Sequence, residues 1–284
     1  MNKVAVVTDS TACIPKEYLK QYNIGVAPLI LIWGQQTFED GVDIQPEAFY
    51  RRLATDEVMP TSSQPPVSKM QQTFSDLLDQ GYSVVSIFIS EKLSGTCQAA
   101  MQARDMLPSG KEKIEIMDSY SSAMCLGLQT LAVARAAADG ASFAECKALA
   151  EKARAHAGLY FTVDTLEFLQ RGGRIGRAQR FLGTALNLKP ILVVRDGRVD
   201  ADERVRTRRK SMERLVEIVV EQCAGKPAVR LAVMDANAPA EAKAVMENAA
   251  SQLNVTEKIF APLSPVIGTH TGPGTLGLAY MTEV

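Results

Sequence analysis

The sequence predicts an α/β protein with two domains. Three short apolar runs in the first half, at residues 4–11, 84–90 and 114–119, stop at polar residues and lead into longer helical patterns. Unbroken apolar runs are typical of parallel strands that helices cover on both faces. The length of 284 residues exceeds the usual domain size of about 100 to 150 residues. We therefore expect an N-terminal domain, residues 1–157, with a parallel sheet in three α/β/α layers.

The second half of the chain changes character after residue 157. Strand patterns there alternate with two longer helical patterns, and the dipeptide Asp196-Gly197 separates two strand-like segments. Such a dipeptide is a strong signal for a hairpin, which makes its two strands antiparallel. We expect a smaller, two-layer α/β domain with a mixed sheet over residues 158–284. Its polar loop around His270 should return to the interdomain cleft, a favoured place for ligands.

Polar residues follow the strands of the first half, where ligands of parallel sheets usually bind. The residues expected to cluster there are Asp9, Ser10, Ser94, Thr96, Asp118 and Ser119. Ser94 and Thr96 open a helix, whose first amides attract negative groups. Helix capping explains these residues about equally well.

A second group of hydroxyls lies in the segment PTSSQPP, residues 60–66. Thr61, Ser62 and Ser63 form a donor cluster in a loop whose shape the prolines fix. The simpler interpretation is a surface loop in which these side chains bond to their own backbone.

The richest motif is SPVIGTHTGPGTLG, residues 264–277. His270 lies between two threonines, away from any helical periodicity, so we expect a ligand contact rather than a packed core histidine. The motif also contains the dinucleotide fingerprint G-x-G-x-x-G. Only seven residues follow Gly277, too few for the helix, strand and acidic residue that this fingerprint requires.

Composition excludes several other classes of function. A formal net charge of -1 provides no overall field for nucleic acid or an anionic membrane. Two isolated histidines suggest no metal site, and no cofactor motif is present. The five cysteines lack a C-x-x-C pair and are interpreted as buried free thiols. Without a signal peptide or a long apolar stretch, we expect a cytoplasmic protein.

One enzyme class stays open on the residues alone. Ser94, His270 and an aspartate at a strand end could form the triad of a serine-dependent esterase or acyl transferase, which is recognised by geometry rather than sequence order. The chain has no G-x-S-x-G elbow, and the segment SGT is more typical of a donor loop.

Two local basic patches occur in the second half, in RGGRIGRAQR and in VRTRRK. A solvated helix face is the simplest interpretation of such patches, and a docking face for an acidic partner is the more specific one. Nucleic-acid binding would also require aromatic residues or a net basic domain.

Taken in order, the motifs TDS, TSSQP, SGT, LQRGGRIG, KPIL, VRTRRK and SPVIGTHTGPGTLG resemble those of the DegV-family fatty-acid-binding proteins. The resemblance implies two α/β domains with a long-chain fatty acid in a buried tunnel between them, and no catalysis by the protein itself. A partner fatty acid kinase would phosphorylate the presented carboxylate. Contact with a membrane surface would be transient.

The resemblance also assigns roles to particular positions. Its carboxylate contacts fall on Thr61, Ser62, Ser63, Ser94 and His270, and Thr96 joins them by its place at the helix start. Its partner-contacting arginines correspond to Arg174 and Arg206, with Arg208 in reserve. Pro66 departs from the family, which commonly has a serine there.

Burial of the hydrocarbon chain should provide most of the affinity of such a protein for its fatty acid. About a dozen buried methylenes at ~0.8 kcal/mol each contribute on the order of 10 kcal/mol before the costs of association. Neutral hydroxyls would then orient the head group. The chain length of the fatty acid and the residues that line the tunnel cannot be predicted from the sequence.

Overall fold

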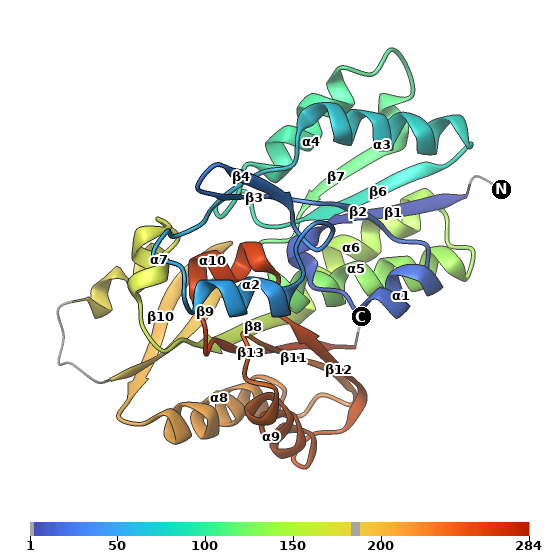
Figure 1. Cartoon of the computed structure of the whole chain (residues 1–284). Helices are drawn as coiled ribbons and strands as arrows, with labels where there is room; N and C mark the ends of the chain where they lie inside the picture. The colour runs from blue at the N-terminus through green and yellow to red at the C-terminus, as the bar shows by residue number, and fades with distance from the viewer. Residues whose placement is uncertain (1–2, 183–187, 284) are drawn as a thin grey trace.

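The computed structural model describes residues 3–182 and 188–283, and its first half contains the expected parallel sheet (Figure 1). Its strands, in the spatial order β2-β1-β6-β7, are β1 (Val4–Asp9), β2 (Gly25–Ala27), β6 (Ser83–Phe88) and β7 (Ile114–Asp118). One face carries α3 (Val67–Asp79) and α4 (Thr96–Asp105), and the other α5 (Ala123–Ala138) and α6 (Phe143–His156). The three-layer α/β/α prediction is confirmed.

A separate six-stranded sheet occupies the second half. In the spatial order β10-β9-β8-β13-β11-β12, its strands are β8 (Ala157–Thr162), β9 (Lys189–Arg195), β10 (Arg198–Val205), β11 (Val229–Asp235), β12 (Val255–Pro262) and β13 (Leu276–Thr282). Only β11 and β12 pair in parallel, so the sheet is mixed, as expected. Helices α8 (Arg208–Gln222) and α9 (Pro239–Ala250) pack on one face.

The predicted hairpin lies between β9 and β10. Asp196 and Gly197 both have positive φ, 51° and 76°, and Arg195 pairs with Arg198 across the turn. Two such residues form the turn whose twist matches that of antiparallel strands.

A third, three-stranded sheet was not predicted. It consists of β3 (Ile30–Trp33), β4 (Gln36–Glu39) and β5 (Thr61–Ser63) in the order β4-β3-β5. The expectation that residues 60–66 form a loop was therefore wrong at its centre, because Ser63 pairs with Ile30 and Thr61 with Ile32. Pairing with a distant strand is not visible in a local pattern of three hydroxyl residues.

Helix α5 is the central element of the molecule. All twelve residues from Ala123 to Ala134 are buried, which is typical of a helix enclosed on every side. It contacts β1 and β6 of the parallel sheet and β8, β11 and β13 of the mixed sheet. One hydrophobic cluster accordingly contains residues of both halves. The division into residues 1–157 and 158–284 stays a prediction.

The segment around His270 is a short helix, contrary to the expectation of a loop. Ser264 accepts a hydrogen bond from the Ile267 amide, Pro265 occupies the first position of α10 (Pro265–Thr271), and Gly272 at φ 78° ends it. These are ordinary start and stop signals. The helix is too short to show a periodic apolar face, which is why the sequence pattern missed it.

The remaining short elements connect these layers. They are α1 (Lys16–Gln21), α2 (Pro46–Leu53), α7 (Glu167–Arg171) and the 3-10 turns η1 (Ser10–Ala12), η2 (Lys111–Lys113) and η3 (Gly176–Phe181). All five cysteines are free of disulfides. Over residues 3–182 and 188–283, no helix combines the length and the apolar character needed to span a bilayer, and no cluster of side chains could hold a metal ion.

Candidate ligand-binding site

An apolar cavity lies between the two main sheets. Its walls come from the six-stranded sheet, β5, α10, the first turn of α5 and the loops that follow β2 and β6. Much of the apolar surface is supplied by Leu159, Phe161, Leu169, Met234 and Val266. It encloses about 840 Å³ free of protein atoms, part of it open to solvent. A cavity of this size and character suits a mainly apolar ligand.

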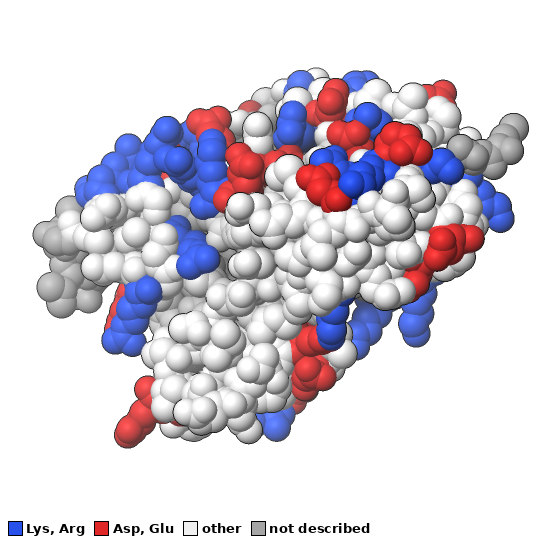
Figure 2. All heavy atoms as spheres, turned by 90° about the horizontal axis from the view of Figure 1, so that it is seen from above, with Lys and Arg blue, Asp and Glu red and all other residues white. Residues whose placement is uncertain are grey.

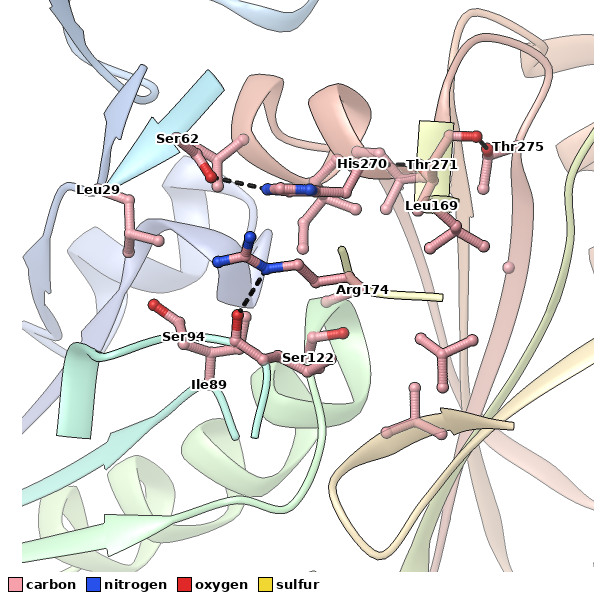
Figure 3. Close-up of a pocket in the computed structure, with 18 of the residues that line it drawn as sticks. Leu29, Ser62, Ile89, Ser94, Ser122, Leu169, Arg174, His270, Thr271 and Thr275 are labelled. Atoms are coloured by element: carbon pink, nitrogen blue, oxygen red, sulfur yellow. Dashed lines mark hydrogen bonds between the residues drawn. The ribbon is translucent and has the colours of Figure 1, made fainter. Parts of the chain in front are cut away.

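One end of the cavity is polar. The Ser62 Oγ lies 2.7 Å from the His270 Nε2, so β5 and α10 bring together two residues that are 208 positions apart in the sequence. In Figure 3 this pair lies on one side of the Arg174 guanidinium, and Ser94 lies on the other. Ser63 also lines the cavity. These side chains form a group of hydrogen-bond donors around one point.

Arg174 is held in place by backbone carbonyls. Its Nε donates to the Leu93 oxygen at 3.1 Å and its Nη1 to the Gly172 oxygen at 2.7 Å. These bonds hold the guanidinium at the cavity wall and leave N–H groups for a ligand (Figure 3). The family resemblance assigned Arg174 to a partner surface, and that assignment stays a prediction; in the structure Arg174 lines the cavity and also the space next to its polar end. The site thus contains a cation besides the expected neutral hydroxyls.

Thr96 supports Ser94 from behind. The two hydroxyl oxygens are 2.8 Å apart, and Thr96 is fully buried at the start of α4, whereas Ser94 lines the cavity. Thr96 is not among the described residues that line the cavity. Its place indicates that it orients Ser94 rather than contacts a ligand.

His270 is neutral near pH 7. Burial, together with the nearby Arg174 guanidinium, lowers the pKa of His270 to about 4. A neutral imidazole with its proton on Nε2 donates to the Ser62 Oγ, and the Ser62 hydroxyl proton can then point at an acceptor in the cavity. His270 would act in this tautomer through Ser62.

An outer cleft adjoins the polar end of the cavity. Ser62, Arg174 and His270 line both spaces. Thr61, which is exposed, lines the outer cleft together with Phe168, Arg171 and Thr269. The shared side chains therefore separate an apolar interior from a space that opens to solvent.

The geometry expected of a hydrolase triad does not form. The hydrogen bond of the Ser94 hydroxyl goes to Thr96, and the His270 Nε2 contacts Ser62 instead. Within residues 3–182 and 188–283, the buried His270 Nδ1 has no hydrogen-bond partner, so no carboxylate orients the ring.

The other polar residues at the strand ends shape loops. Asp9 accepts hydrogen bonds from Thr11 and from the Ile89 amide, and Asp118 accepts from the amides of Glu91 and Tyr120. In the described part of the chain, the wall of the apolar cavity includes neither aspartate. The predicted clustering of all six strand-end residues around one ligand is therefore not what the structure shows.

Asp40 connects this region to the helix that carries His270. Its carboxylate accepts from the Ser10 hydroxyl at 2.7 Å and from the Val266 amide of α10 at 3.4 Å. Burial raises the pKa of Asp40 to about 6. The folded protein therefore holds this proton more tightly than the unfolded chain does between about pH 4 and pH 6.

We expect Asp40→Asn to reduce the pH dependence of stability. In the wild type, the stability from protonated Asp40 is complete below about pH 4 and is lost as the pH rises through 6, a loss on the order of 3 kcal/mol. Asparagine cannot titrate. Urea unfolding at pH 4.5 and pH 7 should show a smaller loss in Asp40→Asn, while the exposed control Asp105→Asn follows the wild type. Equal losses in all three proteins would contradict the assignment.

The other arginines of the two basic patches differ in their exposure and in their ion pairs. Arg206 is exposed and has no ion pair among the described residues, whereas Arg208 pairs with Glu241 at 2.5 Å. Arg177, Arg180 and Arg195 all lie within 3.8 Å of the one buried carboxylate of Asp200. Figure 2 shows basic side chains gathered toward the end of the molecule where α7 lies. A local excess of positive charge is present there despite the near-neutral total.

The structure is an α/β fold with a mainly apolar cavity whose hydrogen-bond donors and one cation lie at one end, an arrangement that suits an apolar molecule with an anionic end. The sequence model of the DegV family, described as uncharacterised proteins, matches residues 3–283. The chain therefore belongs to the DegV family.

Individual relatives match this chain over almost their whole length. A DegV domain-containing protein of Clostridium perfringens is 35% identical, with 99% of both chains covered, and the protein DegV of Bacillus subtilis is 34% identical, with 98% of both covered. Among solved structures, a DegV-family protein of Thermus thermophilus, described by its fatty acid binding, matches with a TM-score of 0.93 at 32% identity, covering 99% of this chain and 100% of its own. The structure of Bacillus subtilis DegV, described as a fatty acid binding protein, matches with a TM-score of 0.91 at 33% identity over the whole of both chains.

The structure adds residues to the site that the sequence analysis missed. Gln64 and Ser122 line the cavity beside the predicted hydroxyls. Ser122 lies between β7 and α5, as Ser94 lies between β6 and α4. Its place in a strand-to-helix connection was the available signal.

Proposed function

We propose that this protein binds a long-chain fatty acid, with the hydrocarbon chain in the apolar cavity and the carboxylate at the cluster of Ser62, Ser94, Arg174 and His270. The observation that carries the proposal is the combination of a mainly apolar cavity with donors grouped at one end. Fatty acid binding by the Thermus thermophilus and Bacillus subtilis relatives supports it.

The two ends of such a ligand would contribute differently. Each buried methylene stabilises the complex by ~0.8 kcal/mol, so the chain provides most of the affinity. The carboxylate would accept charge-assisted hydrogen bonds from Arg174 and neutral ones from the serines. Pairing with Arg174 compensates for part of the cost of removing the carboxylate from water.

Native mass spectrometry of the freshly purified full chain tests this proposal. We expect one fatty acid for each protein molecule, released on denaturation and identified by its mass. A protein that carries no acyl chain after expression, and that binds none of the common saturated and unsaturated acids added to it, would refute the proposal.

We further propose that the protein is a carrier, located in the cytoplasm, and that a separate kinase forms an acyl phosphate on the presented carboxylate. The outer cleft supports this idea, since the residues of the polar end line it as well and the carboxylate would be reachable without emptying the cavity. The protein itself would supply binding and orientation, and the kinase would supply the catalysis.

Ser94→Ala should separate presentation from binding. Because Ser94 contacts only the head group in this proposal, we expect a loss of affinity for the fatty acid of a few fold and a larger loss, ~10-fold or more, in acyl phosphate formation with the kinase. Binding is measured by displacement of a fluorescent fatty acid, and transfer by radiolabelled phosphate. The exposed Ser68→Ala on α3 should match the wild type in both assays. Unchanged transfer in Ser94→Ala would exclude this role.

Arg206→Ala tests the proposed docking of the kinase. Arg206 is exposed and outside the cavity wall, so fatty acid binding should stay at the wild-type level while the apparent KM of the kinase for the loaded protein rises several fold. Arg51→Ala, an equally basic residue exposed on α2, is the matched control. If both variants behave alike, Arg206 has no specific part in docking.

A further inference from the structure

Helices α7 and α10 pack against each other through the glycines at their ends. Gly172 is the C-cap of α7, and Gly272 is the C-cap of α10. A Cβ on Gly172 would lie 3.0 Å from the His270 Cε1 and closer still to its Nδ1, and a Cβ on Gly272 would lie 2.7 Å from the Phe168 Cε2. Each helix therefore seats a ring of the other helix on a residue without a side chain. Both rings line the outer cleft beside the polar end of the cavity.

Gly172 is explained by the space around it and not by its backbone. Its φ of -73° and ψ of -7° are helical values that every residue with a side chain adopts. The next residue, Gly173, is the opposite case, because its φ is 69° while an added Cβ would meet nothing within 4 Å. The atoms nearest to a side chain at Gly172 belong to the His270 ring. The missing side chain thus makes room for that ring.

The His270 ring is held from two sides. Its Nε2 lies 2.7 Å from the Ser62 Oγ, and Gly172 lies against its Nδ1, a buried atom without a hydrogen-bond partner in the described part of the chain. Non-bonded heavy atoms pack at about 3.5 Å, so a methyl group on residue 172 would require the ring to move by about 1 Å. Since Ser62 is already at hydrogen-bond distance, the ring would have to turn and give up that contact.

We infer that Gly172 is a positioning residue of the polar end of the site: because it has no side chain, the His270 ring lies against the end of α7 and reaches Ser62. The Gly172 carbonyl also accepts a hydrogen bond from the Arg174 Nη1 at 2.7 Å, so one residue fixes two of the groups proposed to hold the carboxylate. This inference rests on the proposed function, because the carboxylate is what these groups would orient. The position of the ring itself can be measured without a ligand.

Gly172→Ala should displace His270 while α7 keeps its conformation. We expect the affinity for octadecanoic acid to fall by roughly 3- to 10-fold, the effect of about one lost hydrogen bond. In NMR titrations of the ligand-free protein, the pKa of His270 should rise from about 4 toward its ordinary value, because a displaced ring is less buried. Gly173→Asn adds a larger side chain at the next position, in open space and in a conformation that asparagine tolerates. This control should keep the wild-type affinity and the wild-type pKa of His270.

A double variant separates positioning from a general loss of structure. If Gly172 acts through His270, adding Gly172→Ala to His270→Ala should cause no further loss of affinity, because the methyl group then has space. The losses in melting temperature should likewise be less than additive, which provides the test even if Gly172→Ala is too unstable to titrate.

Three results would overturn the inference: losses that multiply in the double variant, an unchanged pKa of His270 in Gly172→Ala, or equal effects of Gly172→Ala and Gly173→Asn. Fatty acid binding by the wild type would stand in each case. If octadecanoic acid and the other common fatty acids do not bind the wild type, the proposed function fails, while the His270 titration still tests the role of Gly172 in placing the ring.

Discussion

Gly277→Leu should shift the preference of the protein toward shorter fatty acids. Gly277 lines the cavity from β13, and a Cβ there would lie 2.9 Å from the terminal methyl of Met234 and 3.6 Å from Leu159 and Phe161. The added side chain would occupy space for about four carbons of the ligand. At ~0.8 kcal/mol per methylene, affinity for an 18-carbon acid should fall by roughly 100-fold relative to a 14-carbon acid.

Dissociation constants for saturated acids of 10 to 18 carbons would measure this shift. Ala224→Leu adds the same side chain at an exposed position beyond α8 and should leave the profile unchanged. Thermal unfolding of both variants checks that the fold is retained. An equal loss of affinity for all chain lengths in Gly277→Leu would mean that the hydrocarbon chain does not extend past Gly277, contrary to the proposed placement of the ligand.

Arg174→Met should reduce affinity for a fatty acid by roughly 10- to 100-fold, the range expected for a charge-assisted pair. Methionine keeps much of the apolar stem while removing the guanidinium that faces the polar end of the cavity. The methyl ester of the same acid has no charge and should lose little. The pKa of His270 should also rise, since the guanidinium contributes to lowering it.

Parallel titrations with the acid and its ester, together with NMR of the His270 ring against pH, would measure both effects. Arg209→Met, a change at a residue whose side chain is 78% exposed on α8, provides the matched control. Equal losses for acid and ester would show that Arg174 only shapes the wall. An unchanged His270 pKa would place the guanidinium too far from the ring to act on it.

The parts of the fold that local patterns could predict were those with long, uniform signals. The apolar runs of β1, β6 and β7 and the Asp196-Gly197 turn have the lengths and residues on which such predictions depend. The β5 strand and the α10 helix have three and seven residues. Their structure depends on partners distant in the sequence, so no local pattern could reveal it.

The candidate site shows the same division. Ser62, Ser94 and His270 could be selected because they are hydroxyls and a histidine in polar segments between the predicted helices and strands. All three line the cavity. Arg174 and Thr96 could be named from the sequence, but their places relative to the cavity could not be predicted, since a sequence does not say which side of a loop faces inward. One arginine points into the cavity wall, and one threonine is buried behind Ser94.

The position of α5 limits how a lipid can enter. Many two-lobed proteins open around a hinge, so that a ligand is clasped between rigid halves. Here a helix with twelve buried residues packs against both sheets, and a hinge motion would have to pull it away from one of them. Such a motion would expose a large part of the interior. If the protein binds a fatty acid as proposed, loading and release would therefore use a local opening in the cavity wall, while both sheets keep their places against α5.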